Sequence, residues 1–183
     1  MRITENIYET YPIDKKAVEK VIGIKGRSFK KGIPIVVGSK AMLSRFVAKP
    51  SKIALKFIDK FWPGPLSLVL DNRRLPKILE GNNKSVLARV SSAPLFQRLF
   101  KGINFPLTST SANRSGDQNP KSASYVERKL AKNVDLIIDG GYLKSNNPST
   151  ILDLRSGKPT ILREGKISKR KIYTFYKRII GHE

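Results

Sequence analysis

The chain is organised around residues 106–116, which read PLTSTSANRSG. Four consecutive hydroxyl side chains, Thr108 to Ser111, lie on a β-prone run, and Asn113 and Gly116 then supply the chemistry of a turn. Because successive residues of a strand point to opposite faces, some of these hydroxyls must find buried partners, water or a ligand. The pattern by itself favours a loop that bonds its own backbone and a binding site about equally.

The length and composition predict a globular protein. We expect one domain over residues 1–183, long enough to bury a sizeable core. Hydrophobic residues make up 39% of the chain, which excludes the disordered and fibrous classes. No apolar run approaches the roughly 18 residues of a membrane span, and the N-terminus lacks the apolar core of a signal peptide. We therefore expect a soluble, cytoplasmic protein with no membrane partner.

The chain contains no cysteine and one histidine, His182, which is next to last in the sequence. This composition excludes disulfides, thiolate nucleophiles and cysteine metal sites, and it disfavours imidazole catalysis and multi-histidine zinc sites. Any chemistry must therefore use Lys, Arg, Ser, Thr, Tyr, Asn and a few carboxylates.

The formal net charge is +22, from 36 Lys and Arg residues against 14 Asp and Glu residues. This charge exceeds what solubility requires of a small domain, and it implies attraction to polyanions such as RNA or nucleotide phosphates. A solvated, lysine-rich surface is the simpler explanation of the composition alone, because basic residues occur along the whole chain.

Hydrophobic periodicity predicts helices and strands that alternate along the chain. We expect helices over residues 14–26, 39–48, 51–61, 93–102, 122–131 and 168–180, and strands over 33–37, 66–70, 85–90, 134–138, 150–154 and 160–163. Pro34 predicts that one edge of its strand is free, and residues 155–158 predict a hairpin turn. The predicted fold class is α/β, with a twisted mixed sheet flanked by helices.

Two apolar features have both a structural and a functional interpretation. Trp62 continues the apolar stripe of helix 51–61, so a core position is favoured over a stacking platform for bases. The basic helix 168–180 carries Ile172, Phe175 and Ile179 on one face. Docking of this face on the body of the protein is favoured over contact of the helix with a membrane or RNA.

The common nucleotide and hydrolase motifs are absent, including the Walker phosphate loop, the paired-glycine dinucleotide fingerprint, the zinc-protease motif and the nucleophile elbow. A bound nucleotide therefore requires other groups. The candidates are the cations Lys25, Lys31, Arg89 and Arg163, and the donors of Thr110, Ser111, Asn113 and Ser149. For Arg89, near the end of a predicted strand, a surface position is the simpler alternative to a ligand clamp.

Seven short motifs occur in the order and spacing of the YrdC-like family. They are KGR at 25–27, FWPGPLSLV at 61–69, ARV at 88–90, PLTSTSANRSG at 106–116, DGG at 139–141, STI at 149–151 and ILREG at 161–165. The chain resembles this family over residues 3–167, and the combined match is more specific than any single motif. Members of the family include threonylcarbamoyl-AMP synthases, which make the activated intermediate for the threonylcarbamoyladenosine modification of tRNA.

The resemblance implies a YrdC-like α/β sandwich of the single-domain type, with a basic concave cleft. The implied reaction joins L-threonine, bicarbonate and ATP into threonylcarbamoyl-AMP and releases pyrophosphate, with Mg2+ on the phosphates. Proteins of the tRNA threonylcarbamoyl-transfer complex are implied partners. The implied site consists of the catalytic Lys-x-Arg pair Lys25 and Arg27, the Ser-x-Asn pair Ser111 and Asn113, and the further cleft positions Arg89, Ser149 and Arg163.

The resemblance is incomplete at the N-terminus. Residues 3–9 read ITENIYE, where the family has a Pro-Thr-(Asp/Glu)-Thr-Val-Tyr-Gly-Leu-type segment, so Ile3 and Glu9 replace the expected Pro and Gly. Thr4 and Tyr8 of this segment are candidates for threonine binding.

Three functions remain open. Retention of the Lys-x-Arg, Ser-x-Asn and Arg163 positions favours an active threonylcarbamoyl-AMP synthase. The N-terminal departures and the high charge favour a catalytically degenerate relative that binds double-stranded RNA or tRNA through a basic face. The third and weakest alternative is a relative that handles a carbamoyl-adenylate for another acceptor.

Overall fold

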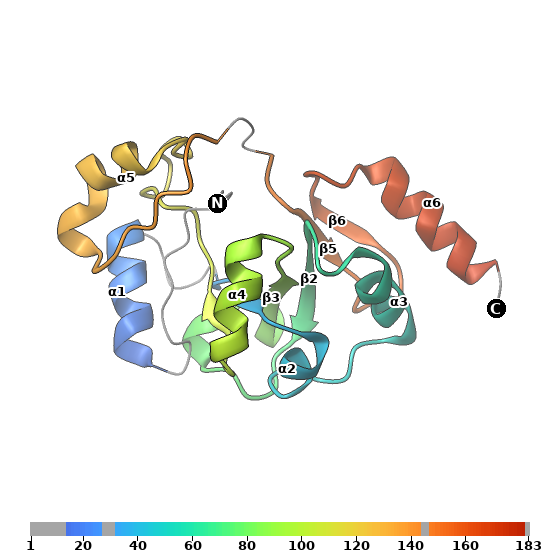
Figure 1. Ribbon diagram of the computed structural model, residues 1–183. Helices are drawn as coiled ribbons and strands as arrows, with labels where there is room; N and C mark the ends of the chain where they lie inside the picture. Colours follow the sequence, from blue (N-terminus) through green and yellow to red (C-terminus); the bar gives the residue numbers. More distant parts are fainter. Residues whose placement is uncertain (1–13, 27–31, 144–146, 182–183) are drawn as a thin grey trace.

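The computed structural model describes residues 14–26, 32–143 and 147–181, and helices and strands alternate along the chain (Figure 1). The α-helices are α1 (Lys15–Lys25), α2 (Lys40–Ser44), α3 (Lys52–Phe61), α4 (Pro94–Gly102), α5 (Ala123–Leu130) and α6 (Lys169–Ile180). The strands are β1 (Ile35–Val37), β2 (Leu66–Asp71), β3 (Ser85–Val90), β4 (Leu107–Thr108), β5 (Thr150–Asp153) and β6 (Thr160–Arg163). Short 3-10 turns occur at Lys77–Leu79, Asn82–Lys84 and Ala131–Asn133.

Polar side chains define where most of the helices begin. The carboxylate of Asp14 accepts a hydrogen bond from the backbone N–H of Ala17 at 3.2 Å. Serine hydroxyls cap four further helices, namely Ser39 for α2, Ser51 for α3, Ser122 for α5 and Ser168 for α6. Gly26 ends α1 at a left-handed φ of +57°, which glycine adopts without steric cost. The predicted starts of these helices are confirmed.

The helix predicted over residues 39–48 is shorter than expected, because α2 ends at Ser44. The chain then turns to meet the end of β2. Val47 forms an antiparallel bridge with Asn72, and the N–H of Ala48 donates to the carbonyl of Asp71 at 2.9 Å. This pairing takes the backbone groups that a longer helix would have used.

The strands form one six-stranded sheet of the described residues, in the order β4-β1-β3-β2-β5-β6. β1 is parallel to β3 and β2 is parallel to β5, whereas the other neighbours are antiparallel. The predicted mixed sheet and α/β class are therefore confirmed.

The free edge predicted from Pro34 is wrong, because β1 pairs with β3 on one side and with β4 on the other. Pro34 precedes the first residue of β1, so its missing N–H costs no hydrogen bond of the sheet. Its carbonyl accepts a hydrogen bond from the N–H of Ser109 at 2.7 Å. The proline is thus compatible with an interior strand.

The two faces of the sheet have different chemistry. Alternate residues of β1, β2, β3 and β5 join the main core, together with side chains from α1, α2, α3 and α6. Because side chains alternate along a strand, Ser67 of β2 and Arg89 of β3 lie on the opposite face. Both residues are buried, so this second face holds polar groups inside the structure.

The strand predicted at residues 134–138 does not form. Val134 and Ile137 instead pack on a small cluster that includes Val21 of α1 and Val126 of α5, whereas the side chain of Leu136 is exposed. Alternating apolar residues do not supply a partner strand by themselves. Here half of them pack on helices and the other half face the solvent.

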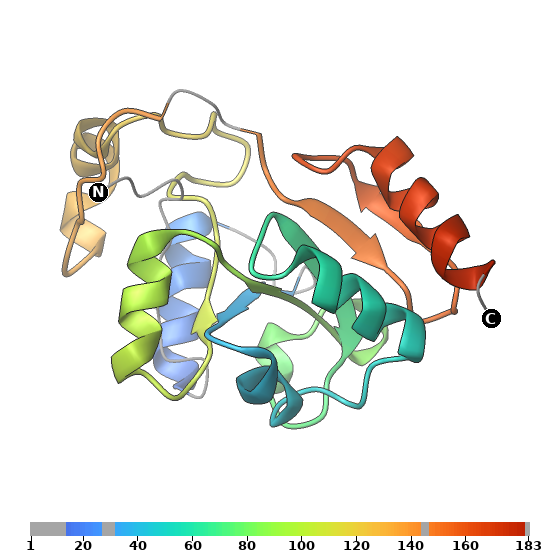
Figure 2. The ribbon, with the colours of Figure 1, turned by 45° about the vertical axis from the view of Figure 1, so that its right-hand side comes forward.

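The C-terminal helix docks on α3, as predicted from its apolar face, and Figure 2 shows the two helices side by side. Ile172 and Ile179 are buried, and the ring of Phe175 meets the rings of Phe57 and Phe61 edge to face, with centroids 4.9 and 5.4 Å away.

Trp62 is also buried, which confirms the core position favoured above. Among the described residues, no helix combines the length and apolar character that spanning a bilayer requires.

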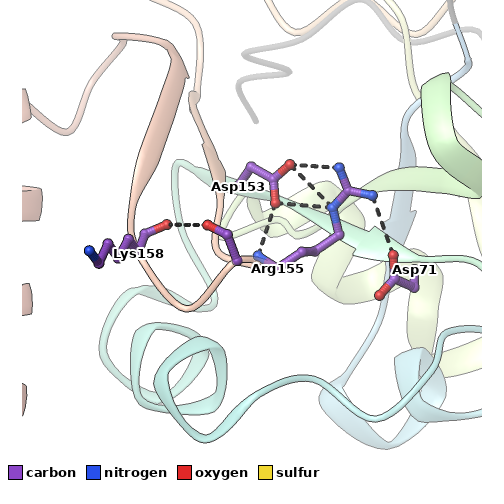
Figure 3. A network of polar contacts seen from close by, with 5 residues as sticks. Asp71, Asp153, Arg155 and Lys158 are labelled. Atoms are coloured by element: carbon purple, nitrogen blue, oxygen red, sulfur yellow. Dashed lines mark hydrogen bonds and ion pairs between the residues drawn. The ribbon is translucent and has the colours of Figure 1, made fainter.

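Arg155 ties the predicted hairpin turn to two strands (Figure 3). Its Nε and Nη2 donate to the carboxylate of Asp153 at 3.0 and 2.7 Å, and its Nη1 donates to the carboxylate of Asp71 at 3.3 Å. Burial by itself raises the pKa of Asp153, but the hydrogen bonds and the charge of Arg155 outweigh this, so the pKa of Asp153 lies below its ordinary value.

We expect Arg155→Met to lower the free energy of unfolding by about 1 kcal/mol at neutral pH, because hydrogen bonds to charged groups contribute on that order and the pair is partly exposed. A carboxyl whose pKa is lowered by folding stabilises the protein above its unfolded pKa of about 3.9 and loses this contribution as the pH falls. In denaturant unfolding, the difference between the wild type and Arg155→Met should therefore shrink below about pH 4.

Lys158→Met is the matched control, because Lys158 lies in the same turn. Its contact there is made by the backbone, since its carbonyl accepts a hydrogen bond from the hydroxyl of Ser156. An equal loss of stability in both variants, or a difference that does not depend on pH, would contradict the role of Arg155.

Candidate active site

The loop that follows β4 leaves the sheet through a turn built from its own polar residues. Beyond the bond from Ser109 to the Pro34 carbonyl, the N–H of Asn113 donates to the carbonyl of Ser111 at 2.9 Å. Gly116 adopts a φ of +94°, a conformation that side chains disfavour. Residues 109–119 therefore fold back on themselves after the two residues of β4, as the Ser, Asn and Gly pattern predicts. Together with β4, we call this segment the 107–119 loop below.

The end of α1 is bonded directly to this loop. Lys25, the last residue of α1, is buried, and its Nζ donates to the carbonyl of Ser111 at 2.8 Å and to Oδ1 of Asn113 at 2.7 Å. The same nitrogen contacts the hydroxyl of Ser111 at 3.3 Å and the carbonyl of Asn113. In return, the carbonyl of Lys25 accepts a hydrogen bond from the N–H of Ser115 at 2.8 Å.

The side chain of Asn113 has a fixed orientation. Its Oδ1 accepts hydrogen bonds from Lys25 and from the hydroxyl of Ser111, the latter at 2.5 Å. Its Nδ2 donates to the carbonyl of Asp117 at 2.7 Å and to Oδ1 of Asn119 at 3.3 Å. Both ends of the amide are therefore used, and the buried lysine sets the shape of the loop through Asn113.

A second polar cluster lies where β5 begins and β6 ends. Nε and Nη2 of Arg163 donate to the carbonyl of Ser149 at 3.2 and 2.9 Å, and Nη2 also contacts the Ser149 hydroxyl at 3.3 Å. That hydroxyl shares a hydrogen bond of 2.8 Å with the hydroxyl of Ser67 on β2. Arg163 is exposed and Ser67 is buried, so the cluster extends from the sheet to the surface.

Glycine and threonine hold this second cluster in place. A Cβ at Gly165 would lie 2.2 Å from the carbonyl oxygen of Pro148, so only glycine allows this approach of the two chain segments. The hydroxyl of Thr150 accepts the N–H groups of Gly165 and Ile167 at 3.0 and 3.1 Å and donates to the carbonyl of Ile167 at 2.6 Å. The need for glycine at position 165 of the ILREG motif is thus explained by the close approach of this motif to the segment that carries the STI motif.

Arg89 lies in the sheet between these two clusters. It is 8% exposed, so the simpler interpretation of a surface position is wrong. It sits beside Val36 of β1 in the parallel pair and on the same face of the sheet as Ser67. The strands of the two clusters lie on either side of β3 in the sheet order, so Arg89 belongs to a strand between them.

The structure therefore brings together two groups of the predicted site residues. Lys25, Ser111 and Asn113 form one group, with Thr110 half-buried next to it in the chain, and Ser149 and Arg163 form the other. Four further candidates, Thr4, Tyr8, Arg27 and Lys31, lie outside the described residues. The basic concave cleft remains a prediction.

Sequence reasoning missed Ser67 and Asn119 as members of these clusters. Ser67 lies within the FWPGPLSLV motif, as a polar residue in a strand that is otherwise apolar and buried. A serine in such a strand needs a polar partner, and this was the signal that could have marked it. Asn119 directly precedes Pro120 in a polar segment, and nothing local distinguishes it from an ordinary turn residue.

Comparisons with known proteins agree with the motif resemblance. The family model of the Sua5/YciO/YrdC proteins, described as "Telomere recombination", matches residues 10–165. A protein of Chromobacterium violaceum named threonylcarbamoyl-AMP synthase is 35% identical over 149 residues, which cover 80% of this chain and 76% of the relative.

Two solved structures share the fold. The crystal structure of Pyrococcus abyssi Sua5 complexed with L-threonine matches 91% of this chain with a TM-score of 0.85 and 28% identity. This chain spans only about half of that protein, since the match covers 49% of it. E. coli YciO matches 86% of this chain and 77% of its own, with a TM-score of 0.78 and 27% identity. Sequence motifs, sheet topology and these matches agree that the chain belongs to the Sua5/YciO/YrdC family.

Proposed function

We propose that this chain is a threonylcarbamoyl-AMP synthase, a nucleotidyltransferase that uses L-threonine, bicarbonate and ATP. The observation that carries the proposal is the contact of the buried Lys25 amino group with both Ser111 and Asn113, because the family resemblance places these three residues in one site. The relatives of that name and the threonine-bound Sua5 structure support it.

The proposed reaction has two bond-forming steps. The amino group of threonine attacks the carbon of bicarbonate and water leaves, which yields a carbamate. A carbamate oxygen then attacks the α-phosphorus of ATP, and the bond from that phosphorus to the bridging oxygen breaks as pyrophosphate departs. Both steps bring anions together, so fixed cations and hydrogen-bond donors are the groups that would lower the barrier.

Arg163 is suited to hold a carboxylate or phosphate of the substrates. The Ser149 carbonyl and hydroxyl fix its guanidinium in one orientation, and a preorganised guanidinium loses little freedom when it binds an anion. Arg89 would add a second, buried cation on the same side of the sheet. Ser149, oriented by Ser67, would donate or accept a hydrogen bond beside them.

Lys25 has a different role in this proposal. Its ammonium group already contacts four oxygen atoms of the 107–119 loop, so we assign it as a positioning residue that presents Ser111 and Asn113. Arg27 and Lys31 would contact the phosphates, and Thr110, Thr4 and Tyr8 would contact the remaining substrate groups.

Metal and partners complete the proposal. In the described part of the chain, no group of three or more His, Cys, Asp or Glu side chains is arranged to hold a metal ion. As the family resemblance implies, Mg2+ would arrive with ATP and be held by its phosphate oxygens. The product would pass in the cytoplasm to proteins of the tRNA threonylcarbamoyl-transfer complex, and RNA is a further proposed partner.

The first experiment measures turnover. With ATP, bicarbonate and magnesium, the purified chain should release pyrophosphate only when L-threonine is added, and mass spectrometry should detect threonylcarbamoyl-AMP. Arg27→Ala should abolish both signals. Pyrophosphate release that does not depend on threonine would contradict the proposal, and absent turnover with intact RNA binding would support the catalytically degenerate alternative.

Arg163→Ala should lower kcat/KM by about 100-fold, because removing one preorganised electrostatic group typically costs this much. Arg163→Lys should recover part of the loss, since lysine restores the positive charge but not the planar guanidinium with its fixed donors. Lys158→Ala, in the same β5–β6 hairpin, is the control and should leave turnover unchanged. Equal kinetics of Arg163→Ala and the control would remove Arg163 from the site.

Lys25→Met tests the positioning role through stability as well as turnover. Removing the ammonium leaves buried oxygens of Ser111 and Asn113 without their donor, which should cost about 2–4 kcal/mol in the free energy of unfolding. Lys16→Met, at an exposed position of the same helix, should change it by less than about 0.5 kcal/mol. If Lys25→Met lost turnover at full stability, Lys25 would instead act on the substrates directly.

A further inference from the structure

Two serine hydroxyls meet where β2 lies beside the start of β5. Oγ of Ser67 lies 2.8 Å from Oγ of Ser149. Ser67 is buried within β2, whereas Ser149, directly before β5, is half-buried. Among the described residues, Ser149 is the one hydrogen-bond partner of the Ser67 hydroxyl. The proton of the Ser67 hydroxyl therefore has a single acceptor within reach.

The Ser149 hydroxyl has a further neighbour that can only donate. Nη2 of Arg163 contacts Oγ of Ser149 at 3.3 Å, and a guanidinium group has N–H donors but no acceptor. One lone pair of the Ser149 oxygen is therefore occupied by Arg163. The Ser149 proton can point toward Ser67 or toward the open side of the site, but not toward Arg163.

Only one arrangement of the two serine protons gives each of them an acceptor. A hydroxyl has one proton and two lone pairs. If Ser149 donated to Ser67, the Ser67 proton would be buried without an acceptor, which is costly. If Ser67 donates instead, its proton is paired, and Ser67 and Arg163 together fill both lone pairs of Ser149. The favoured arrangement thus leaves the proton of the half-buried Ser149 hydroxyl available.

The Ser111 hydroxyl of the other polar cluster has the opposite property. It donates its proton to Oδ1 of Asn113 at 2.5 Å, and its oxygen contacts the Lys25 ammonium group at 3.3 Å. Its proton is therefore used inside the protein. Of these two candidate site serines, Ser149 is the one that keeps a proton for a ligand.

The surroundings of the serine pair favour an anion as that ligand. The register that pairs Leu68 with Ala88 places Arg89 of β3 opposite Ser67, and Arg163 belongs to β6 on the other side of β5. Arginines therefore come from the strands on both sides of the pair. The Arg163 guanidinium and the Ser149 hydroxyl are in contact, so both can donate to one anionic oxygen, which offers only lone pairs.

We propose that Ser67 is a positioning residue, which donates its proton to Ser149 and so makes Ser149 a hydrogen-bond donor to an anionic oxygen of the substrates. The identity of this oxygen rests on the proposed function. It belongs to the carboxylate of threonine, to the carbamate or to a phosphate of ATP. The direction of the hydrogen bond from Ser67 to Ser149 does not rest on that function.

The kinetic test compares Ser67→Val with Ser67→Thr. The two side chains have nearly the same shape, but only threonine keeps a hydroxyl proton. Ser67→Val should lower kcat/KM about tenfold, the effect of losing one hydrogen bond of about 1.4 kcal/mol. Ser67→Thr should stay within about threefold of the wild type. Equal kinetics of the two variants would overturn the proposal, because they would show a role in packing alone.

A double variant tests whether Ser67 acts through Ser149. Ser149→Ala should lower kcat/KM by about 100-fold, since it removes a donor to the substrate. Adding Ser67→Val to Ser149→Ala should cause no further loss, because the residue through which Ser67 acts is already gone. Losses that multiply would overturn the proposal. Thermal unfolding checks that every variant folds.

Calorimetric titrations of Ser67→Val distinguish the possible sources of the anionic oxygen. Weaker binding of L-threonine alone would assign the carboxylate, and weaker binding of a non-hydrolysable ATP analogue would assign a phosphate. A lower kcat with both Kd values unchanged would assign the carbamate, which forms during the reaction. If Ser67→Val changed neither Kd nor kcat, the proposal would be overturned.

A neutron crystal structure of the deuterated, ligand-free protein tests the proton arrangement directly. The deuterium of Ser67 should lie on the line to Oγ of Ser149, and the deuterium of Ser149 should point away from both Ser67 and Arg163. A deuterium that belongs to Ser149 and points to Ser67 would overturn the proposal. This result does not depend on turnover, so an inactive protein with the expected deuterium positions would reject only the proposed synthase activity.

Discussion

A buried lysine ammonium is the interaction on which the candidate site depends. An ammonium group removed from water must be compensated by oxygen atoms around it, and the 107–119 loop supplies these oxygens to Lys25. The position of the cation is itself set by hydrophobic packing, because Val18, Val21 and Ile22 bury the inner side of α1. Hydrophobic packing of α1 therefore positions the Lys25 ammonium group. The hydrogen bonds of this ammonium group then hold the loop that carries Ser111 and Asn113.

The rest of the site uses the sheet as its frame. Arg163 and Ser149 come from the strands β5 and β6 at one side of the sheet order, whereas the 107–119 loop follows β4 at the other side. Neighbouring strands lie about 4.8 Å apart, so β4 and β5, which are four steps apart in the sheet order, are separated by about 19 Å. A substrate pair as long as ATP with threonine suits this separation better than threonine alone.

Features that depend on neighbouring residues, such as the starts of helices, could be predicted from the sequence. Features that depend on contacts between distant segments, such as strand partners, could not. Helix starts followed from Asp14 and the capping serines because these side chains bond residues three positions later. Periodicity failed at residues 134–138, and the proline rule failed at Pro34, where it predicted a free edge. In both cases the outcome depends on whether a distant part of the chain supplies a strand partner, which the local sequence does not identify. The contact of Lys25 with Asn113 spans 88 residues, and only the family resemblance placed both residues in one site. The roles of Gly165 and Ser67 depend on a close approach of distant segments, which no local pattern records.

The central claim is that two polar clusters from distant parts of the chain bind the two ends of one substrate assembly. The most direct measurement is a crystal structure of the protein with L-threonine and a non-hydrolysable ATP analogue. The account predicts a ligand that touches both the Ser111–Asn113 loop and the Ser149–Arg163 cluster, with Lys25 still bonded to the loop. A ligand bound away from either cluster, or a Lys25 ammonium that leaves the loop to contact the phosphates, would contradict it.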